Sequence, residues 1–146
     1  MIKAEASTAI RRPIGQLFEN VTDPRNEPEW HTDVGEASPV EPGPFRVGTT
    51  IRYVFPFMGR RVHSIGEVVA YDAPHLESIK FSSGPMGLAP TITYLFEPLP
   101  EGTRFTRRIE AAPSGLVGVF EPLMTRMIAS RNARFVENLR RRFKVD

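Results

Sequence analysis

The spacing of hydrophobic residues near the start of the chain changes from a period of two to a period near 3.6. Residues 2–10 alternate, and one face of this segment carries Ile2, Ala4, Ala6 and Ile10, which predicts a half-buried strand. Residues 13–21 (PIGQLFENV) place apolar side chains at helical spacing behind a proline that suits a first helical turn. Asp23 can then cap a second short helical turn that carries Trp30.

From about residue 34 the period returns to two, through VGEASPVE, GTTIRYVFPFM, RRVHSIGEVVAY, HLESIKFSS, TITYLFEP and GTRFTRRIEA. This pattern predicts a meander of antiparallel strands. A two-residue loop at Gly59-Arg60 would set Arg52 opposite Glu67. A loop over residues 99–102 would set Tyr94 opposite Arg107, and Glu97 opposite Arg104 on the outer face.

The longest helical pattern runs from about Gly118 to Phe143. Its apolar stripe, which one arginine interrupts, holds Phe120, Met124, Met127, Ile128, Arg131, Phe135 and Leu139. Such a helix needs a large apolar partner, and the inner face of the meander is the candidate. The predicted fold is therefore α+β, a curved antiparallel sheet of about six or seven strands around a long C-terminal helix.

Composition narrows the choice of function. The 146 residues include no cysteine, which excludes a thiol nucleophile and a thiolate metal site. The net charge is only +2, and apart from Arg140, Arg141 and Arg142 the basic residues alternate with acids, so we expect no nucleic-acid partner. No run approaches the ~20 apolar residues of a membrane span, and a cytoplasmic location is the default expectation.

Several segments carry a family resemblance: Arg12-Pro13 after the first strand, ENVTDPRNEPEW, GEVVAYDAP, FEPLPEGTRFTRRIE and ARFVENLRRRF. In this order the chain resembles the helix-grip superfamily of START lipid-transfer domains, birch-pollen-type allergens and polyketide cyclase or dehydrase-like proteins. The resemblance covers residues 1–146 as a single domain. It implies a cavity between the sheet and the long helix for a hydrophobic or aromatic ligand. It implies no particular reaction, because members range from carriers to aromatase-cyclases.

The expected ligand-binding residues are the large inward side chains and the polar groups among them. They are Trp30, Tyr53, Phe55, Phe57, Phe81, Tyr94, Phe96, Arg107, Met124, Met127 and Arg131. Each of the apolar ones also fits a plain core position. Trp30, the only tryptophan, either plugs one end of the core or contacts ligand.

Arg107 is the least expected residue of this face, because alternation places it beside Phe105 and Ile109. Its guanidinium could stack on Tyr94, reach an acid, extend to the cavity mouth, or bind an oxygen of a ligand. Arg131, in the middle of the helical stripe, raises the same question.

Residues for metal or acid–base chemistry are harder to assign. His31, His63 and His75 are far apart in sequence, so we expect neither a metal nor another cofactor. Glu27 and Glu29 fall in a segment that reads as a solvated turn, and no inward-facing acid or histidine can be assigned. The sequence therefore favours a carrier of a lipid-like or polyketide-like molecule. The alternative is a cyclase or dehydrase acting in the same cavity, with tyrosine acid catalysis and arginine stabilisation.

Overall fold

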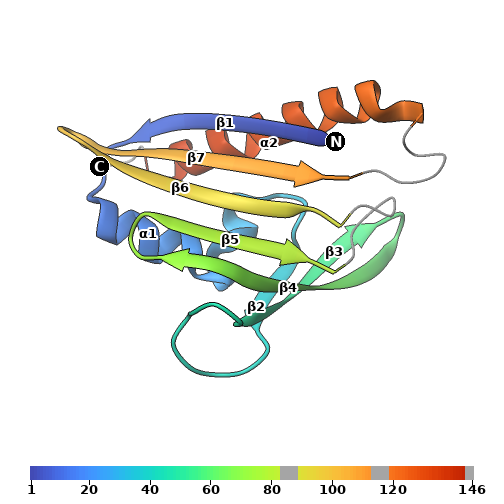
Figure 1. The fold of residues 1–146 in the computed structure, drawn as a ribbon, viewed down its shortest axis with the longest axis horizontal. Helices are drawn as coiled ribbons and strands as arrows, with labels where there is room; N and C mark the ends of the chain where they lie inside the picture. The colour runs from blue at the N-terminus through green and yellow to red at the C-terminus, as the bar shows by residue number, and fades with distance from the viewer. Residues whose placement is uncertain (83–88, 113–118, 144–146) are drawn as a thin grey trace.

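A seven-stranded antiparallel sheet in the order β1-β7-β6-β5-β4-β3-β2 forms the frame of the protein (Figure 1). The computed structural model describes residues 1–82, 89–112 and 119–143. The elements are β1 (Ile2–Ile10), α1 (Ile14–Thr22), the 3-10 helix η1 (Pro24–Glu29), β2 (Glu36–Pro39), β3 (Thr50–Phe57), β4 (Arg60–Asp72), β5 (Leu76–Phe81), β6 (Thr91–Leu99), β7 (Gly102–Ala111) and α2 (Glu121–Arg142). The predicted fold class, a curved sheet with a long C-terminal helix, is confirmed.

The hairpin between β6 and β7 has the predicted pairing. Tyr94 lies opposite Arg107, Phe96 opposite Phe105, and Glu97 opposite Arg104. The β3–β4 hairpin does not, because its two-residue turn is Met58-Gly59, and Thr50 rather than Arg52 pairs with Glu67. Both turn residues have positive φ, 50° for Met58 and 77° for Gly59. Positive φ at both central residues is typical of a type I′ turn, whose backbone twist matches that of the flanking strands. The shift of two residues leaves each side chain on its predicted face.

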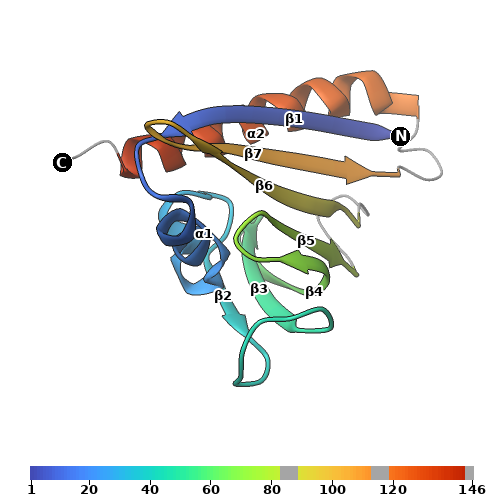
Figure 2. The same cartoon turned by 60° about the vertical axis from the view of Figure 1, so that its left-hand side comes forward.

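The long helix α2 runs along β1 at one side of the sheet (Figures 1 and 2). Its buried residues are Met124, Asn132, Phe135, Val136 and Leu139. Three residues of the predicted stripe are instead exposed: Phe120, Met127 and Arg131. The buried face of α2 is therefore rotated relative to the predicted one. Its centre is a polar residue, Asn132, which a prediction based on apolar residues alone leaves out.

The inner face of the sheet depends on two local features of β4. The β4–β5 register shifts between Val68 and Ala70, and this bulge turns Tyr71 toward the core beside α1. At Gly66 an added Cβ would lie 2.7 Å from Ile79 Cγ2 and 3.2 Å from Tyr53 Cε2. Because Gly66 has no side chain, the Tyr53 ring can lie across β4 at this position.

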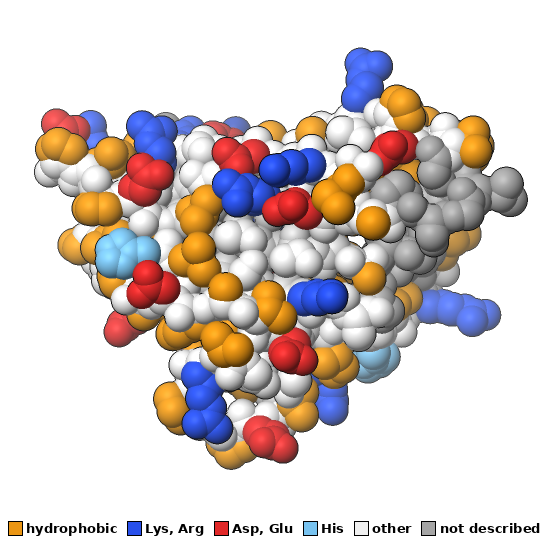
Figure 3. All heavy atoms as spheres, in the orientation of Figure 1, with side chains coloured by type: hydrophobic (Ala, Val, Ile, Leu, Met, Phe, Trp, Pro, Cys, Tyr) orange, Lys and Arg blue, Asp and Glu red, His pale blue; other side chains and the backbone are white. Residues whose placement is uncertain are grey.

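The outer face of the sheet is polar and mixed in charge. Figure 3 shows acidic and basic side chains interspersed rather than gathered by sign. Arg108 pairs with Glu5 at 2.8 Å, and hydroxyl groups bond between strands, Ser7 with Thr106 and Ser78 with Thr93. None of the helices that the structure describes is long and apolar enough to cross a membrane.

Candidate functional site

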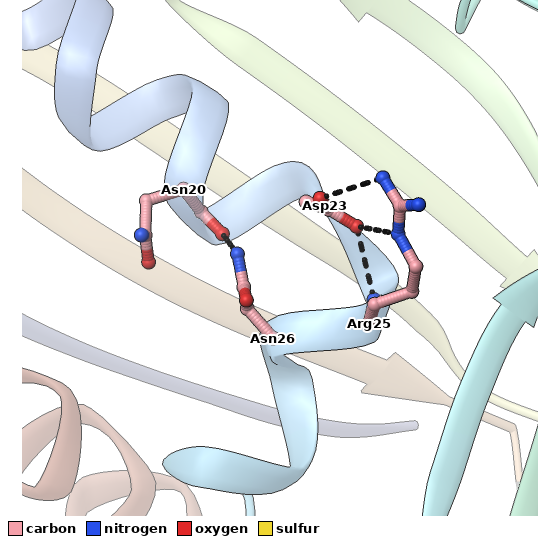
Figure 4. Close-up of polar contacts among 4 residues, drawn as sticks. All are labelled: Asn20, Asp23, Arg25 and Asn26. Atoms are coloured by element: carbon pink, nitrogen blue, oxygen red, sulfur yellow. Dashed lines mark hydrogen bonds and ion pairs between the residues drawn. The ribbon is translucent and has the colours of Figure 1, made fainter.

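The junction of α1 and η1 is fixed by short polar contacts, which Figure 4 shows. Asp23 accepts hydrogen bonds from the backbone N–H of Arg25 at 3.1 Å and from its guanidinium at 2.9 and 3.0 Å. These bonds lower the pKa of Asp23 below its usual value. Asn26 Nδ2 donates to the carbonyl of Asn20 at 3.1 Å. Asp23 caps η1 as predicted, and the fixed junction sets the direction in which η1 presents its side chains.

The segment from Glu27 to His31 enters the interior. Glu27, Trp30 and His31 are all buried, and the Trp30 indole lies edge-on to the Tyr94 ring with centroids 6.1 Å apart. The carbonyl of Trp30 accepts a bond from Asn138 Nδ2 of α2 at 3.1 Å. Trp30 thus packs at the junction of η1, α2 and the sheet. The expectation that Glu27 sits in a solvated turn is wrong, because η1 folds under the sheet and carries this side chain inward.

Arg107 is buried with 2% of its surface exposed, so it does not extend to solvent. Its Nη1 donates to Asn132 Oδ1 at 2.6 Å, while Asn132 Nδ2 donates to the Arg107 carbonyl at 2.9 Å. The guanidinium lies 5.9 Å from the centroid of the Tyr94 ring and 5.4 Å from that of Phe135. Arg107 is therefore held as a buried cation whose Nε–H has no acceptor among the described residues.

Two buried carboxyl groups, Glu27 and Glu77, lie close enough to influence each other, and the charge of Arg107 acts on Glu27. Burial raises the pKa of Glu77 to about 8, with the neighbouring Glu27 adding to the rise. Burial likewise raises the pKa of Glu27 to about 7, and the charge of Arg107 limits that rise. Glu77 lies opposite Tyr94 on the β5–β6 ladder, and its Oε2 lacks a partner within the described part of the chain. Both acids are thus poised to gain or lose a proton near neutral pH.

Tyrosine and histidine side chains complete this polar group. The Tyr94 hydroxyl donates a long hydrogen bond of 3.5 Å to Glu27 Oε1. Burial raises the pKa of Tyr94 and Tyr53, so both remain neutral donors. His31 stacks on Phe135 with centroids 3.9 Å apart, and burial holds its pKa well below the usual range. We call Glu27, Tyr53, Glu77, Tyr94 and Arg107 the inner polar cluster.

The other expected ligand-binding residues divide into three sets. Phe81 and Phe96 are buried and Phe55 is half-buried, all within the main core around the inner polar cluster. Met124 packs apart from them, in a small group with Ile2 and Ala111. Met127 and Arg131 are exposed, and Arg131 pairs with Asp33 at 2.6 Å on the surface. The side chain of Phe57 lies outside the described part of the structure.

Sequence reasoning missed Glu27, Glu77 and Asn132. Glu77 had a usable signal, since alternation in HLESIKF puts it on the same face as Ile79 and Phe81. Asn132 had a weaker one, lying between Ile128 and Phe135 at helical spacing. Glu27 had none, because its burial depends on how η1 packs beneath the sheet.

An open hollow that described residues line has a volume of about 650 Å³. It lies between α1, the loop after β2 and the β4–β5 turn. Its walls include Phe18, Phe45, Tyr71, Glu19 and Asp23. No residue of α2 lines this hollow, so it is not the expected cavity between the sheet and α2. Trp30, Tyr94 and Phe135 pack together in the core on that side of the sheet.

The hollow and the inner polar cluster share a wall. The Phe18 ring, which lines the hollow, lies 5.6 Å from Tyr71 and 5.1 Å from Phe96 of the inner face. Tyr71, which also lines the hollow, stands opposite Glu77 on the β4–β5 ladder. Among the described residues no group of three or more histidine, cysteine or acidic side chains has the geometry to hold a metal ion.

Comparison with known proteins places this geometry in a family. Residues 1–144 match the family described as polyketide cyclase / dehydrase and lipid transport. The chain belongs to this family. No curated protein matches the sequence. Members of this polyketide cyclase / dehydrase and lipid transport family bind small hydrophobic ligands. The chain has the helix-grip fold.

Solved structures share the fold at low identity. A START superfamily protein from Mycobacterium smegmatis aligns with a TM-score of 0.80 and 12% identity, over 97% of each chain. The protein TTHA0849 from Thermus thermophilus gives a TM-score of 0.75 and 19% identity, covering 97% of this chain and 96% of the other. The di-domain ARO/CYC BexL from the BE-7585A biosynthetic pathway gives 0.78 and 16%, with 97% of this chain but only 46% of BexL covered. At these identities the likeness establishes the fold alone.

Proposed function

We propose that this chain binds a small, mostly apolar or aromatic molecule that carries carbonyl, phenol or carboxylate oxygens. The observation that carries the proposal is the inner polar cluster, which sits within an aromatic inner face. Arg107 Nε and Glu77 Oε2 lack partners there, within the part of the chain that is described. Buried polar groups are normally paired, so unpaired ones favour a ligand that supplies the missing acceptor and donor.

The hollow beside α1 gives the direction from which a ligand reaches the cluster. Its volume of about 650 Å³ falls within the range of small-molecule sites. Phe18 and Tyr71 line the hollow and separate it from the inner face of the sheet. On the inner side, Phe18 contacts Phe96 and Tyr71 stands opposite Glu77. In our proposal the ligand occupies the hollow with its apolar part and displaces these rings to bring its oxygens to Arg107 and Glu77.

The test compares acidic and neutral analogues of one aromatic scaffold by isothermal titration. Arg107→Met keeps much of the apolar stem and removes the charge. It should weaken binding of the acidic analogue by roughly ten- to a hundredfold, the effect of losing a hydrogen bond to a charged group. Arg131→Met, at the surface pair with Asp33, is the matched control and should leave both affinities unchanged. Equal affinities of wild type and Arg107→Met for the acidic analogue would remove Arg107 from the site.

A second function, acid–base catalysis on the bound molecule, is favoured by one observation. Glu27 of η1 and Glu77 of β5 have pKa values of about 7 and about 8, close to working pH, and lie close enough for Glu27 to raise the pKa of Glu77. In a dehydration, one carboxylate would take the proton next to a carbonyl while the other carboxyl protonates the departing hydroxyl, releasing water. A carrier needs neither group to ionise.

The catalytic function is tested with an aromatic β-hydroxy ketone, whose loss of water produces a conjugated product that absorbs at longer wavelength. Glu27→Gln and Glu77→Gln should each lower the rate by roughly a hundredfold or more, within the range of general acid–base contributions. Glu29→Gln on the outer side of η1 is the control. Binding of the ketone without any enhancement of its dehydration would leave the carrier as the function.

A further inference from the structure

The inner polar cluster holds two acids and one cation. Glu27 is 5% exposed, Glu77 1% and Arg107 2%, so all three groups are shielded from water. The charge of Arg107 acts on Glu27, and Glu27 in turn acts on Glu77. A buried carboxylate that lacks a cation takes up a proton rather than remain charged. The cluster is therefore balanced when Arg107 offsets one carboxylate and the other acid is protonated.

The groups packed around the cluster supply little further charge. Among the described elements, the other titratable groups that act on its members or are acted on by them are Glu19 of α1, His31 after η1, Tyr71 of β4 and Arg131 of α2. Burial keeps His31 neutral by holding its pKa well below the usual range, and burial raises the pKa of Tyr71. Arg131 is half-exposed and pairs with Asp33 at 2.6 Å. Within this described set, Arg107 is thus the buried cation.

We propose that Glu27 selects the charge of the ligand, because a carboxylate ligand enters the inner polar cluster together with a proton that Glu27 takes up from solvent. This inference rests on the proposed function, in which an oxygen of the ligand reaches Arg107. A carboxylate at Arg107 diverts the guanidinium charge from Glu27 and leaves two buried anions for one cation. Protonation of Glu27 restores the balance. A neutral amide or ketone brings no charge, so it binds without a proton.

Affinity for a carboxylate should therefore fall as pH rises. Burial raises the pKa of Glu27, and Arg107 limits it to about 7 in the free protein. A carboxylate bound at Arg107 raises this pKa further, since it removes the compensating charge. Below about pH 6 Glu27 is protonated in both states and affinity is flat, whereas above about pH 7 it falls by up to about tenfold per pH unit.

The experiment compares 2-naphthoate with 2-naphthamide, which has nearly the same shape and no charge, by isothermal titration from about pH 6 to about pH 9. Repeating the titration at about pH 8 in buffers of different ionisation enthalpy counts the protons taken up. The wild type should take up about one proton with naphthoate and none with naphthamide. Glu27→Gln is neutral from the start and leaves Arg107 to the ligand. It should bind naphthoate about tenfold more tightly than the wild type at about pH 8, with proton uptake largely abolished.

A second measurement needs no ligand. Arg107→Met removes the same compensating charge that a bound carboxylate would divert, so it should raise the pKa of Glu27 in the free protein. Carboxyl-carbon NMR of the titrating side chain follows this shift. Glu29→Gln, the same change on the same helix at a surface ion pair with Arg142, is the matched control and should titrate and bind as the wild type does.

The outcomes separate this inference from the proposed function. Naphthoate binding that depends on Arg107 but takes up no proton and does not vary with pH would overturn the role of Glu27 and leave the binding function standing. An unchanged pKa of Glu27 in Arg107→Met would also overturn it. Failure of the wild type to bind both probes, or equal affinities of wild type and Arg107→Met for naphthoate, would overturn the two proposals together.

Discussion

Arg107 and Asn132 bind each other twice, side chain to side chain at 2.6 Å and side chain to backbone at 2.9 Å. The pair joins β7 to the buried face of α2, and the amide oxygen is the acceptor that permits a buried guanidinium at this position. Without it, Arg107 would place unpaired donors in an aromatic core, at a cost comparable to losing a hydrogen bond to a charged group.

Asn132→Ala should therefore lower the free energy of unfolding by about 2–3 kcal/mol, measured by urea denaturation. Asn138→Ala is the control on the same helix, because Asn138 makes one bond, to the uncharged carbonyl of Trp30, and should cost about 1 kcal/mol. In an Arg107→Met background the cost of Asn132→Ala should shrink, since the charge that needs the amide oxygen is gone. A cost no larger than that of Asn138→Ala would contradict this account.

Glu77 should make stability depend on pH. Its native pKa of about 8 exceeds the ordinary value of 4.5, so the native state favours the protonated acid. The contribution is fully present below about pH 4.5 and is lost as pH rises through 8. Glu77→Gln resembles the neutral acid and avoids this loss. The free energy of unfolding of the variant minus that of the wild type should thus increase by roughly 3–5 kcal/mol from pH 5 to pH 9. This range follows from about 1.4 kcal/mol per unit of pKa shift.

The control for this series is Glu67→Gln, the same change of residue type at an exposed position of β4. His31, whose pKa is lowered, destabilises the native state as pH falls, but it is present in every variant and cancels in the differences. A pH-independent difference for Glu77→Gln would mean that Glu77 is solvated in solution.

Trp30 should report on the interior by fluorescence, and it is the only tryptophan. Its complete burial against Tyr94 predicts emission at shorter wavelength than free indole, with a red shift on denaturation. Binding of an aromatic ligand that rearranges the inner face should also change the emission. Native emission equal to that of free indole, unchanged by denaturant, would refute the burial.

Gly66 and Gly15 should respond oppositely to alanine. A Cβ at Gly66 meets Ile79 Cγ2 at 2.7 Å and the Tyr53 ring at 3.2 Å, so Gly66→Ala should destabilise the fold by about 1–3 kcal/mol. Gly15 lies in α1 with nothing within 4 Å of an added Cβ, so Gly15→Ala should stabilise it by about 0.5–1 kcal/mol. Thermal unfolding of both variants and of the wild type measures the difference. If Gly15→Ala lost as much stability as Gly66→Ala, the close approach at Gly66 would not be the cause.

The sequence alone determined the element order and most of the strand faces. Alternation along a strand depends only on neighbouring residues, so it places Tyr94, Phe96 and Arg107 inward and predicts the β6–β7 register correctly. It fails by two residues at Met58-Gly59, where the choice rests on backbone angles that sequence spacing does not give.

Tertiary packing decided the chemistry of the inner face. Glu27 reads as a solvated turn residue until η1 folds beneath the sheet, and the polar Asn132 becomes the centre of a buried helix face because Arg107 lies opposite it. Arg131 looks inward in a stripe of apolar residues, yet the rotation of α2 brings it to Asp33 at the surface. Periodicity predicts which residues share a face of a strand or helix. Their burial and pKa depend on which elements from distant parts of the chain pack against that face.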